Sequence, residues 1–308
     1  MFRGRACQNL SRLEVKRGIM SRNFDIVIDS ACDMPSVYLQ GKRVDCVPLG
    51  FTMNNVNYAG ESGEKITEKA FYQKLREGSM PTTYQVTAEQ AKSHIETHLQ
   101  EGKDVLVLAF SSALSGTAGS FAVAARELKK LYPKRKVLVV DSLCASMGEG
   151  LLLDYVLRKA DGGAGLEETA RYAEGIKGRI CHHFTVDNLF HLKRGGRVNS
   201  ATAVIGSILK IKPIMRVDEA GRLEVVTKII GRKKALATLV DRVFESAEME
   251  DGDPIFISHG DCIEDAEYVK DLIRIRNPKV RIEIHYVGSV IGAHAGAGVV
   301  AVFHKGRR

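Results

Sequence analysis

The sequence predicts an α/β protein in which a parallel-sheet N-terminal domain is followed by a second α/β domain with a mixed sheet. Short apolar runs alternate with helical patterns through the first half, and this order is typical of parallel βαβ units with right-handed crossovers. The second half combines such units with a hairpin pattern, which favours a mixed sheet. The glycine-rich stretch Asp161-Gly-Gly-Ala-Gly165 separates the halves and predicts a domain boundary.

The chain length agrees with this division, because 308 residues are long for one domain and comfortable for two. We expect the first domain at residues 23–165 and the second at 166–308. Residues 1–22 are basic and lack a continuous apolar segment, so we expect a disordered extension rather than a secretory signal. A transit peptide is the alternative, and translation could begin at Met1 or at Met20.

The elements of the first half follow from the spacing of apolar residues. Phe24 to Ile28 is an apolar run closed by the turn-rich 29–35, which predicts a strand, and 51–58 alternates around Asn54-Asn55, which predicts a hairpin. In chain order, the other expected elements are a strand at 44–49, helices at 67–77 and 88–99, a strand at 105–110, a helix at 118–131, a strand at 136–141 and a helix opening after 142–148.

The second half mixes helices and strands less regularly. The turn-forming 218–222 lies between two apolar runs and predicts a second hairpin, whereas the glycine-rich 288–298 is expected to be a loop. The expected helices lie at 166–176, 188–193, 201–209, 234–247 and 262–275, and the expected strands at 180–186, 211–217, 223–229, 254–258, 280–287 and 299–303.

The distribution of charge argues against a nucleic-acid-binding protein. The formal charge is +8, but residues 1–22 hold six basic side chains against one glutamate, and the last four residues hold three more. Residues 23–304 are therefore neutral overall, which leaves no electrostatic footprint for duplex binding. The lack of tryptophan further weakens a model of base stacking.

Cysteine usage and hydropathy indicate a cytoplasmic protein without stable membrane insertion. The six cysteines are scattered and form no C-x-x-C pair, which favours reduced thiols over disulfides or a zinc site. No uncharged apolar stretch approaches the length of a membrane span.

A group of hydroxyl side chains follows the strand expected at 105–110. The segment Ser111-Ser-Ala-Leu-Ser-Gly-Thr117 leads directly into the next expected helix. Such a turn faces the crevice at the carboxyl ends of parallel strands, and the free amides that begin a helix favour an anion. Because one hydroxyl would suffice to cap the helix, four of them favour an oxyanion-binding site. A nucleophilic serine is the alternative, although the G-x-S-x-G elbow is absent.

Basic and imidazole side chains supply weaker signals. His294 stands among glycines and alanines, which let a ligand approach the ring closely, so we expect it to face a ligand. Lys193-Arg-Gly-Gly-Arg197 could bind an anion or remain solvated. His94 and His98 are four residues apart without the H-E-x-x-H pattern, which favours an exposed helix face over zinc. No Walker loop or G-x-G-x-x-G after a strand predicts a nucleotide.

In its motifs the chain resembles the DegV family across residues 24–303. Each matching segment is short, but their order and spacing together are specific. They are Asp29-Ser-Ala-Cys-Asp-Met-Pro35, Pro81-Thr-Thr-Tyr-Gln85, Ser111-Ser-Ala-Leu-Ser-Gly-Thr117, Asp141-Ser-Leu-Cys-Ala-Ser-Met-Gly148, Leu192-Lys-Arg-Gly-Gly-Arg197, Ile211-Lys-Pro-Ile214 and Gly292-Ala-His294.

The resemblance implies a ligand site between the two domains that binds a long-chain fatty acid. By motif, the carboxylate would lie against Thr83, Ser115 and His294. Supporting positions would be Thr82, Ser111, Ser112, Gly116, Thr117 and Arg197. Some members are the acyl-binding subunit of bacterial fatty-acid kinase, so a separate kinase subunit is the implied partner. The resemblance implies no metal and no cofactor besides the bound fatty acid. Tyr84 stands where the family commonly has serine, which implies a shorter or redirected pocket.

Physical chemistry is consistent with that role. Each methylene of an acyl tail gains about 0.8 kcal/mol on burial, whereas an unpaired buried carboxylate is expensive and needs charge-assisted hydrogen bonds. The sequence leaves two alternatives open, a Ser/Thr-dependent acyl hydrolase and a regulatory DNA-binding protein.

Overall fold

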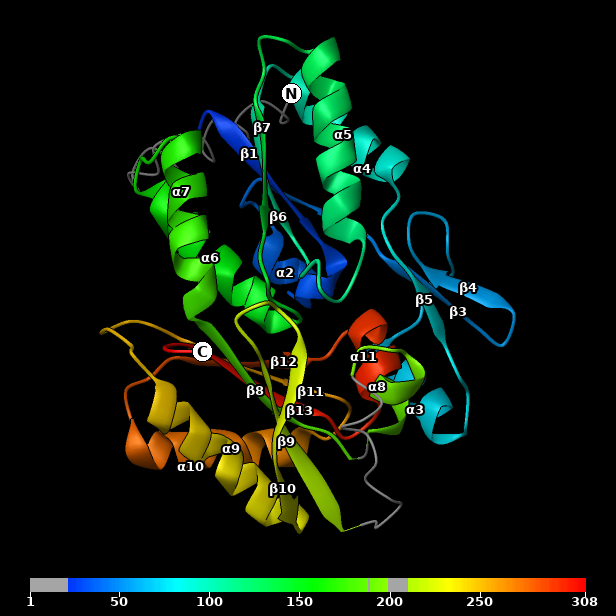
Figure 1. Cartoon of the computed structure of the whole chain (residues 1–308), viewed down its shortest axis with the longest axis vertical. Helices are drawn as coiled ribbons and strands as arrows, with labels where there is room; N and C mark the ends of the chain where they lie inside the picture. The colour runs from blue at the N-terminus through cyan, green and yellow to red at the C-terminus, as the bar shows by residue number, and fades with distance from the viewer. Residues whose placement is uncertain (1–21, 188, 199–209) are drawn as a thin grey trace, which may run out of the picture.

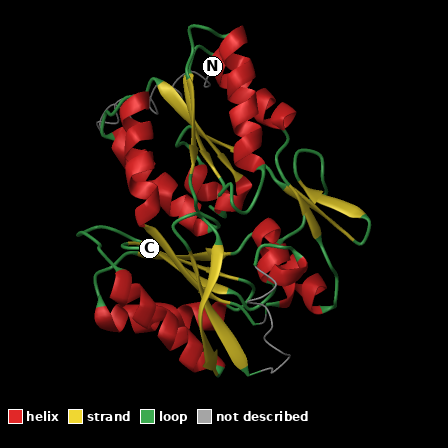
Figure 2. Ribbon diagram, viewed as in Figure 1, coloured by secondary structure: helices red, strands yellow, loops and turns green. Residues whose placement is uncertain are grey.

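Four parallel strands form the first sheet of the computed structural model, which describes residues 22–187, 189–198 and 210–308 (Figures 1 and 2). Their order is β2 (Val44–Val47), β1 (Phe24–Asp29), β6 (Asp104–Ala109) and β7 (Val137–Asp141). All six residues of β1 are buried, as expected for a strand covered on both faces. This arrangement confirms the predicted parallel sheet.

Helices cover both faces of this sheet (Figure 1). The helices on one face are α4 (Ala88–Gln100) and α5 (Thr117–Leu131), and those on the other are α6 (Met147–Asp161) and α7 (Leu166–Ile176). Thr87 and Gln90 form a capping box that fixes the start of α4. Helix α6 also contacts strands of the second sheet, so it joins the two halves of the molecule.

The order of strands creates a switch point at β1. The chain continues from β1 to β2 on one side and returns to β6 on the other, which opens a crevice at the carboxyl ends of β1 and β6. At the end of β1, the Asp29 carboxylate accepts hydrogen bonds from the amides of Ala31 (3.1 Å) and Phe110 (2.8 Å). The hydroxyl-rich turn after β6 is therefore held at this crevice.

A small antiparallel sheet flanks the crevice. It consists of β4 (Val56–Ala59), β3 (Gly50–Met53) and β5 (Thr82–Tyr84). Asn54 and Asn55 have φ values of 52° and 61°, as the two-residue turn of a hairpin requires, so the predicted hairpin is confirmed. Strand β5 was not predicted, because three residues are too few for a visible alternation. The neighbouring short elements are η1 (Ser30–Cys32), α2 (Ser36–Leu39) and α3 (Glu68–Arg76).

The second sheet is mixed, as predicted, with only its β11–β12 pair parallel. Its order is β10 (Leu223–Ile230), β9 (Ile211–Val217), β8 (Ile180–Thr185), β13 (Val300–Lys305), β11 (Ile255–His259) and β12 (Ile282–Tyr286). Helices α9 (Arg232–Ser246) and α10 (Ile263–Arg276) cover the face that points away from the first sheet (Figure 1). The short η2 (Lys177–Arg179) precedes β8, and α8 (Phe190–Arg194) follows it.

The glycine-rich segment near the C-terminus differs from its prediction. The glycine-rich 288–298 was wrongly expected to be a loop, because Ser289–Ala295 forms helix α11, which Gly288 precedes in extended conformation and Gly296 ends at φ 80°. Helix α7 packs against α6 and β7, and the boundary after residue 165 stays a prediction. Of the expected disordered extension at 1–22, residues 1–21 lie outside the described residues, whereas Arg22 is buried and donates a hydrogen bond to the Lys42 carbonyl. The expected helix at 201–209 also lies outside the described residues.

Candidate functional site

A cavity of about 330 Å³ lies between the carboxyl ends of the first sheet and the inner face of the second. This volume is within the range of small-molecule sites. Most of its lining is apolar, and the apolar residues come from both halves of the chain. They are Leu49, Phe110, Leu114, Ala145, Phe184, Leu192, Val217, Leu223, Val287, Val290, Ile291, Ala295, Val299, Ala301 and Phe303.

Strand alternation builds the floor of the cavity. In β13, Ala301 and Phe303 face the cavity, and in β8, His182 and Phe184 do so. The antiparallel register pairs Phe303 with His182 and Ala301 with Phe184. Because alternate residues of a strand share one face, these four side chains form a continuous surface.

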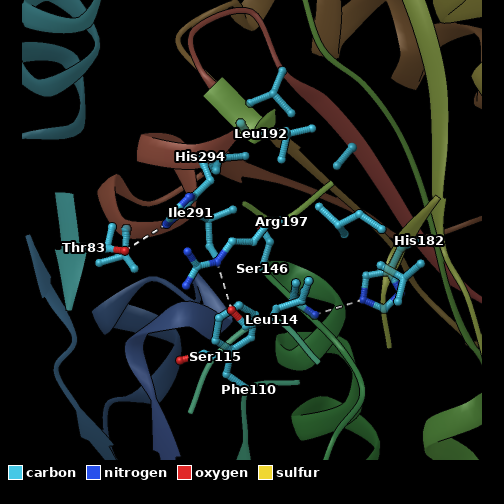
Figure 3. Close-up of a pocket in the computed structure, with 18 of the residues that line it drawn as sticks. Thr83, Phe110, Leu114, Ser115, Ser146, His182, Leu192, Arg197, Ile291 and His294 are labelled. Carbon is cyan, nitrogen blue, oxygen red and sulfur yellow. Dashed lines mark hydrogen bonds between the residues drawn. The ribbon is translucent and has the colours of Figure 1, made fainter. Parts of the chain in front are cut away.

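A threonine and a histidine meet at one end of the cavity (Figure 3). Thr83 Oγ1 on β5 lies 2.8 Å from Nε2 of His294 on α11. His294 Nδ1 is buried and has no partner among the described residues. Burial, and then the positive charges of Arg197 and Arg194, lower the pKa of His294 to about 4. The imidazole is therefore neutral at pH 7.

Gly195 allows the backbone to approach this imidazole. A Cβ at position 195 would lie 2.1 Å from His294 Nδ1, well inside van der Waals contact. The glycine of Lys193-Arg-Gly-Gly-Arg197 thus serves a close approach rather than a phosphate-binding turn.

Two arginines without a carboxylate partner in the described part of the chain lie beside the Thr83–His294 pair. Arg197 lines the cavity and donates from Nε to the Leu114 carbonyl (3.0 Å) and from Nη1 to the Gly195 carbonyl. Arg194 donates to the carbonyls of Pro81 (2.9 Å) and Ala293 (3.3 Å). Backbone carbonyls hold both guanidinium groups without neutralising them, so this end of the cavity favours an anion.

Ser115 lines the same cavity, and its hydroxyl contacts Thr117, the first residue of helix α5. Its Oγ lies 3.0 Å from Thr117 Oγ1 and accepts a hydrogen bond from the Thr117 amide at 3.3 Å. A hydroxyl oxygen has two lone pairs, so Ser115 can hold the Thr117 amide and still face the cavity. The expected contact of Ser115 with an oxyanion stays a prediction.

The other predicted supporting residues surround the cavity without lining it. Ser111 is fully buried and donates to the Gly221 carbonyl at 2.9 Å, which ties the turn to the β9–β10 hairpin. Thr82 is exposed on β5, and Ser112 is exposed with its amide on Asp141. Gly116 is the N-cap of α5, and Thr117 is buried in its first turn.

Sequence reasoning missed several polar lining residues. Gln85 follows β5, Ser146 precedes α6 at φ 53°, and His182 lies on β8. The alternation of 180–186 could have placed His182 on the same face as Phe184. The Tyr84 ring also lines the cavity and covers Gly50, where a Cβ would lie 2.2 Å from the ring.

The described residues contain no group of three or more His, Cys, Asp and Glu side chains placed to hold a metal ion. His94 and His98 are partly buried and pair with Asp45 and Asp25. Among the helices that the structure describes, none is both long and apolar enough to cross a membrane.

Comparison with known proteins gives consistent matches over most of the chain. The sequence model of the DegV family matches residues 23–306. A DegV domain-containing protein from Clostridium perfringens is 41% identical over 285 residues, which cover 92% of this chain and 98% of the relative. A DegV domain-containing protein from Lactococcus lactis is 30% identical over 286 residues, with the same coverage.

Solved structures with the same fold include fatty-acid-binding proteins. One is a DegV-family protein from Thermus thermophilus, with a TM-score of 0.83 and 29% identity over 92% of this chain and 99% of that one. Another is DegV from Bacillus subtilis, a fatty-acid-binding protein with a TM-score of 0.79 and 28% identity over 93% and 100%.

Proposed function

The chain belongs to the DegV family, and on that premise we propose that it binds a long-chain fatty acid in the cavity between its two sheets. The observation that carries the proposal is a mostly apolar cavity whose one end holds the Thr83–His294 pair and the unneutralised Arg197. An amphiphile with one anionic group and a long apolar tail fits this distribution of chemistry.

The apolar lining would supply the affinity for the tail. Each buried methylene contributes about 0.8 kcal/mol, so a tail of many carbons offsets the entropy lost on binding. The wall residues come from both halves of the chain and include strand residues such as Val217 and Phe303, which are each 2% exposed. Because the wall is already formed, little free energy is lost to rearrangement of the protein on binding.

The polar end would hold the carboxylate. The hydroxyls of Thr83 and Ser115 can donate to its oxygens, and Arg197 supplies a positive charge beside them. His294 is neutral in the free protein, and a carboxylate nearby would raise its pKa again. Binding would then take up a proton and form a charge-assisted hydrogen bond, which is stronger than a neutral one.

This polar end lies close to the surface, which suits presentation to a partner. Tyr84 beside Thr83 is 40% exposed, and Ser112 and Gly116 in the adjacent turn are also exposed. We also propose that the chain acts in the cytoplasm and presents the bound carboxylate to a separate kinase subunit, which phosphorylates it. The chain itself would perform no catalysis. Acyl-phosphate should form from labelled ATP only when the chain, a fatty acid and the kinase subunit are all present. Formation without the chain would contradict this role.

An acyl hydrolase is the second candidate, favoured by one observation. Thr83 Oγ1 and His294 Nε2 have the spacing of a nucleophile and its base. The orienting third group is missing, because His294 Nδ1 meets no carboxylate in the described residues. A fluorophosphonate probe should leave Thr83 and Ser115 unlabelled, and labelling of either would support the hydrolase.

Lipid analysis tests the binding proposal directly. Gently purified protein should carry co-purified fatty acid, visible by native mass spectrometry and identified after solvent extraction. Replacing His294 by Ala should weaken binding roughly ten- to a hundredfold, since a hydrogen bond to a charged group contributes about 1.5–3 kcal/mol. His285→Ala is the matched control, because His285 lies on β12 away from the cavity lining. Protein that neither carries nor takes up fatty acid would overturn the proposal.

A further inference from the structure

The end of the cavity opposite the Thr83–His294 pair is closed by His182 (Figure 3). The figure places Thr83 and His182 on opposite sides, with Arg197 between them. Strand β13 gives the direction along the floor, because Val299 follows α11 while Phe303 pairs with His182. Four residue steps of a strand span about 13 Å, so an acyl tail held at His294 would run toward His182.

A second cleft, of about 450 Å³, lies directly beyond this end. His182 and Val217 line both the cavity and the cleft. The register explains why, since the β8–β9 ladder ends at the pair His183–Arg216. His182 and Val217 are the next opposed residues, at the point where the two strands separate.

The cleft is chemically unlike the cavity. Its lining includes Arg216, Arg242 and Arg308. Arg308 donates to the carbonyls of Ile180 and Asp218. A tail that reached this cleft would pass from an almost wholly apolar wall to one that carries guanidinium groups beside apolar residues such as Val217 and Val226, so each methylene should gain less there than in the cavity.

The His182 ring is held rigidly in the wall. Its Nε2 accepts a hydrogen bond from the Ala145 amide at 3.2 Å, and its Nδ1 donates to the Ile180 carbonyl at 2.9 Å. The ring packs edge-on against Phe303, with centroids 5.3 Å apart. Gly148 makes room for it, because a Cβ there would lie 2.0 Å from Nε2. His182 is 2% exposed, so its ring is enclosed by the wall as well as hydrogen-bonded to it.

We propose that His182, with Val217 beside it, terminates the acyl cavity and so limits the length of the fatty acid that the chain accepts. This inference rests on the proposed fatty-acid binding. It assigns a specificity-determining role to a residue that contacts the tail, far from the group that holds the carboxylate. Removing the ring would connect the cavity to the cleft and admit longer tails.

The test offers an equimolar series of saturated fatty acids of increasing length to the purified, delipidated chain, and native mass spectrometry records which lengths stay bound. In the wild type, occupancy should fall sharply for fatty acids longer than a limiting chain length. In His182→Ala, the maximum should move to longer chains, with up to about fourfold more occupancy for each further methylene that the opened wall can shelter. Val217→Ala should shift it the same way by less, and it keeps the test valid if loss of the imidazole prevents folding.

The matched control is His183→Ala. His183 is the next residue of the same strand, faces away from the cavity and lies with its Nε2 3.0 Å from Ser246 Oγ, so its length profile should equal that of the wild type. An unchanged profile in fatty-acid-bound His182→Ala and Val217→Ala would overturn the inference while leaving the proposed function intact. Failure of the wild type to bind any fatty acid would instead overturn the proposed function itself, and the length limit with it.

Discussion

Gly195→Ala tests the role of the His294 ring without removing any polar group. Gly195 has φ −75° and ψ −7°, a conformation that alanine adopts without strain. The added methyl would lie 2.1 Å from His294 Nδ1 and 2.9 Å from Cε1. The ring must therefore move by more than an ångström, and this movement breaks the 2.8 Å contact with Thr83.

Two opposing contributions set the expected change in stability. Alanine is favoured over glycine in a helical conformation by up to about 1 kcal/mol, whereas loss of one hydrogen bond costs about 0.5–1.5 kcal/mol. The change in the free energy of unfolding should therefore lie between a gain of about 0.5 kcal/mol and a loss of about 1.5 kcal/mol. Ligand binding should suffer more, because a displaced imidazole no longer reaches the carboxylate, and affinity should fall roughly tenfold or more.

The assay combines urea denaturation with titration of a fluorescent fatty acid. Gly175→Ala is the control, because Gly175 lies in α7 and an added Cβ there meets nothing within 4 Å. The control should gain about 0.5–1 kcal/mol of stability and keep wild-type affinity. If Gly195→Ala shows the same gain and binds as tightly as the wild type, the ring does not hold the carboxylate.

Three further predictions concern charge. Fatty-acid binding should take up a proton near neutral pH, because the pKa of His294 is about 4 in the free protein and rises beside a carboxylate. Calorimetry in buffers of different ionisation enthalpy measures this proton uptake. Binding without proton uptake would contradict the prediction. Burial raises the pKa of Asp33 to about 7, so the stability that Asp33 contributes is complete below about pH 4 and is lost as pH rises to about 7. The free energy of unfolding should therefore vary less with pH in Asp33→Asn than in the wild type between about pH 4 and 7. Parallel plots of unfolding free energy against pH for the two proteins would refute this. The hydrogen bonds that the His98 imidazolium donates to Asp25 and then to Asp45 raise the pKa of His98 to about 9, so the stability that His98 adds should be present below about pH 6.5 and lost as pH rises through 9. The stability difference between wild type and His98→Gln should shrink over that range, and a constant difference would count against the ion pairs.

The sequence alone determined the two-part α/β architecture, because strand and helix periods are local properties. Strand β1 followed from the short, mainly apolar run that ends at Ile28, and the Asn54-Asn55 hairpin followed from residues that tolerate positive φ. The same local logic failed for β5, which is too short to show a period, and for α11, whose glycines suggested a loop.

The grouping of the site was decided only by the tertiary structure. Thr83 and His294 are 211 positions apart and meet because β5 and α11 both pack beside the crevice. Ser111 and Ser115 belong to one turn, yet the Ser111 hydroxyl donates to a backbone carbonyl while Ser115 faces the cavity. The wall at His182 arises where two strands diverge. The sequence supplies the side chains that can face a ligand. Which of these side chains face the cavity depends on the register and separation of the strands. Register and separation are set by packing between segments that are remote along the chain, so they cannot be predicted from local patterns.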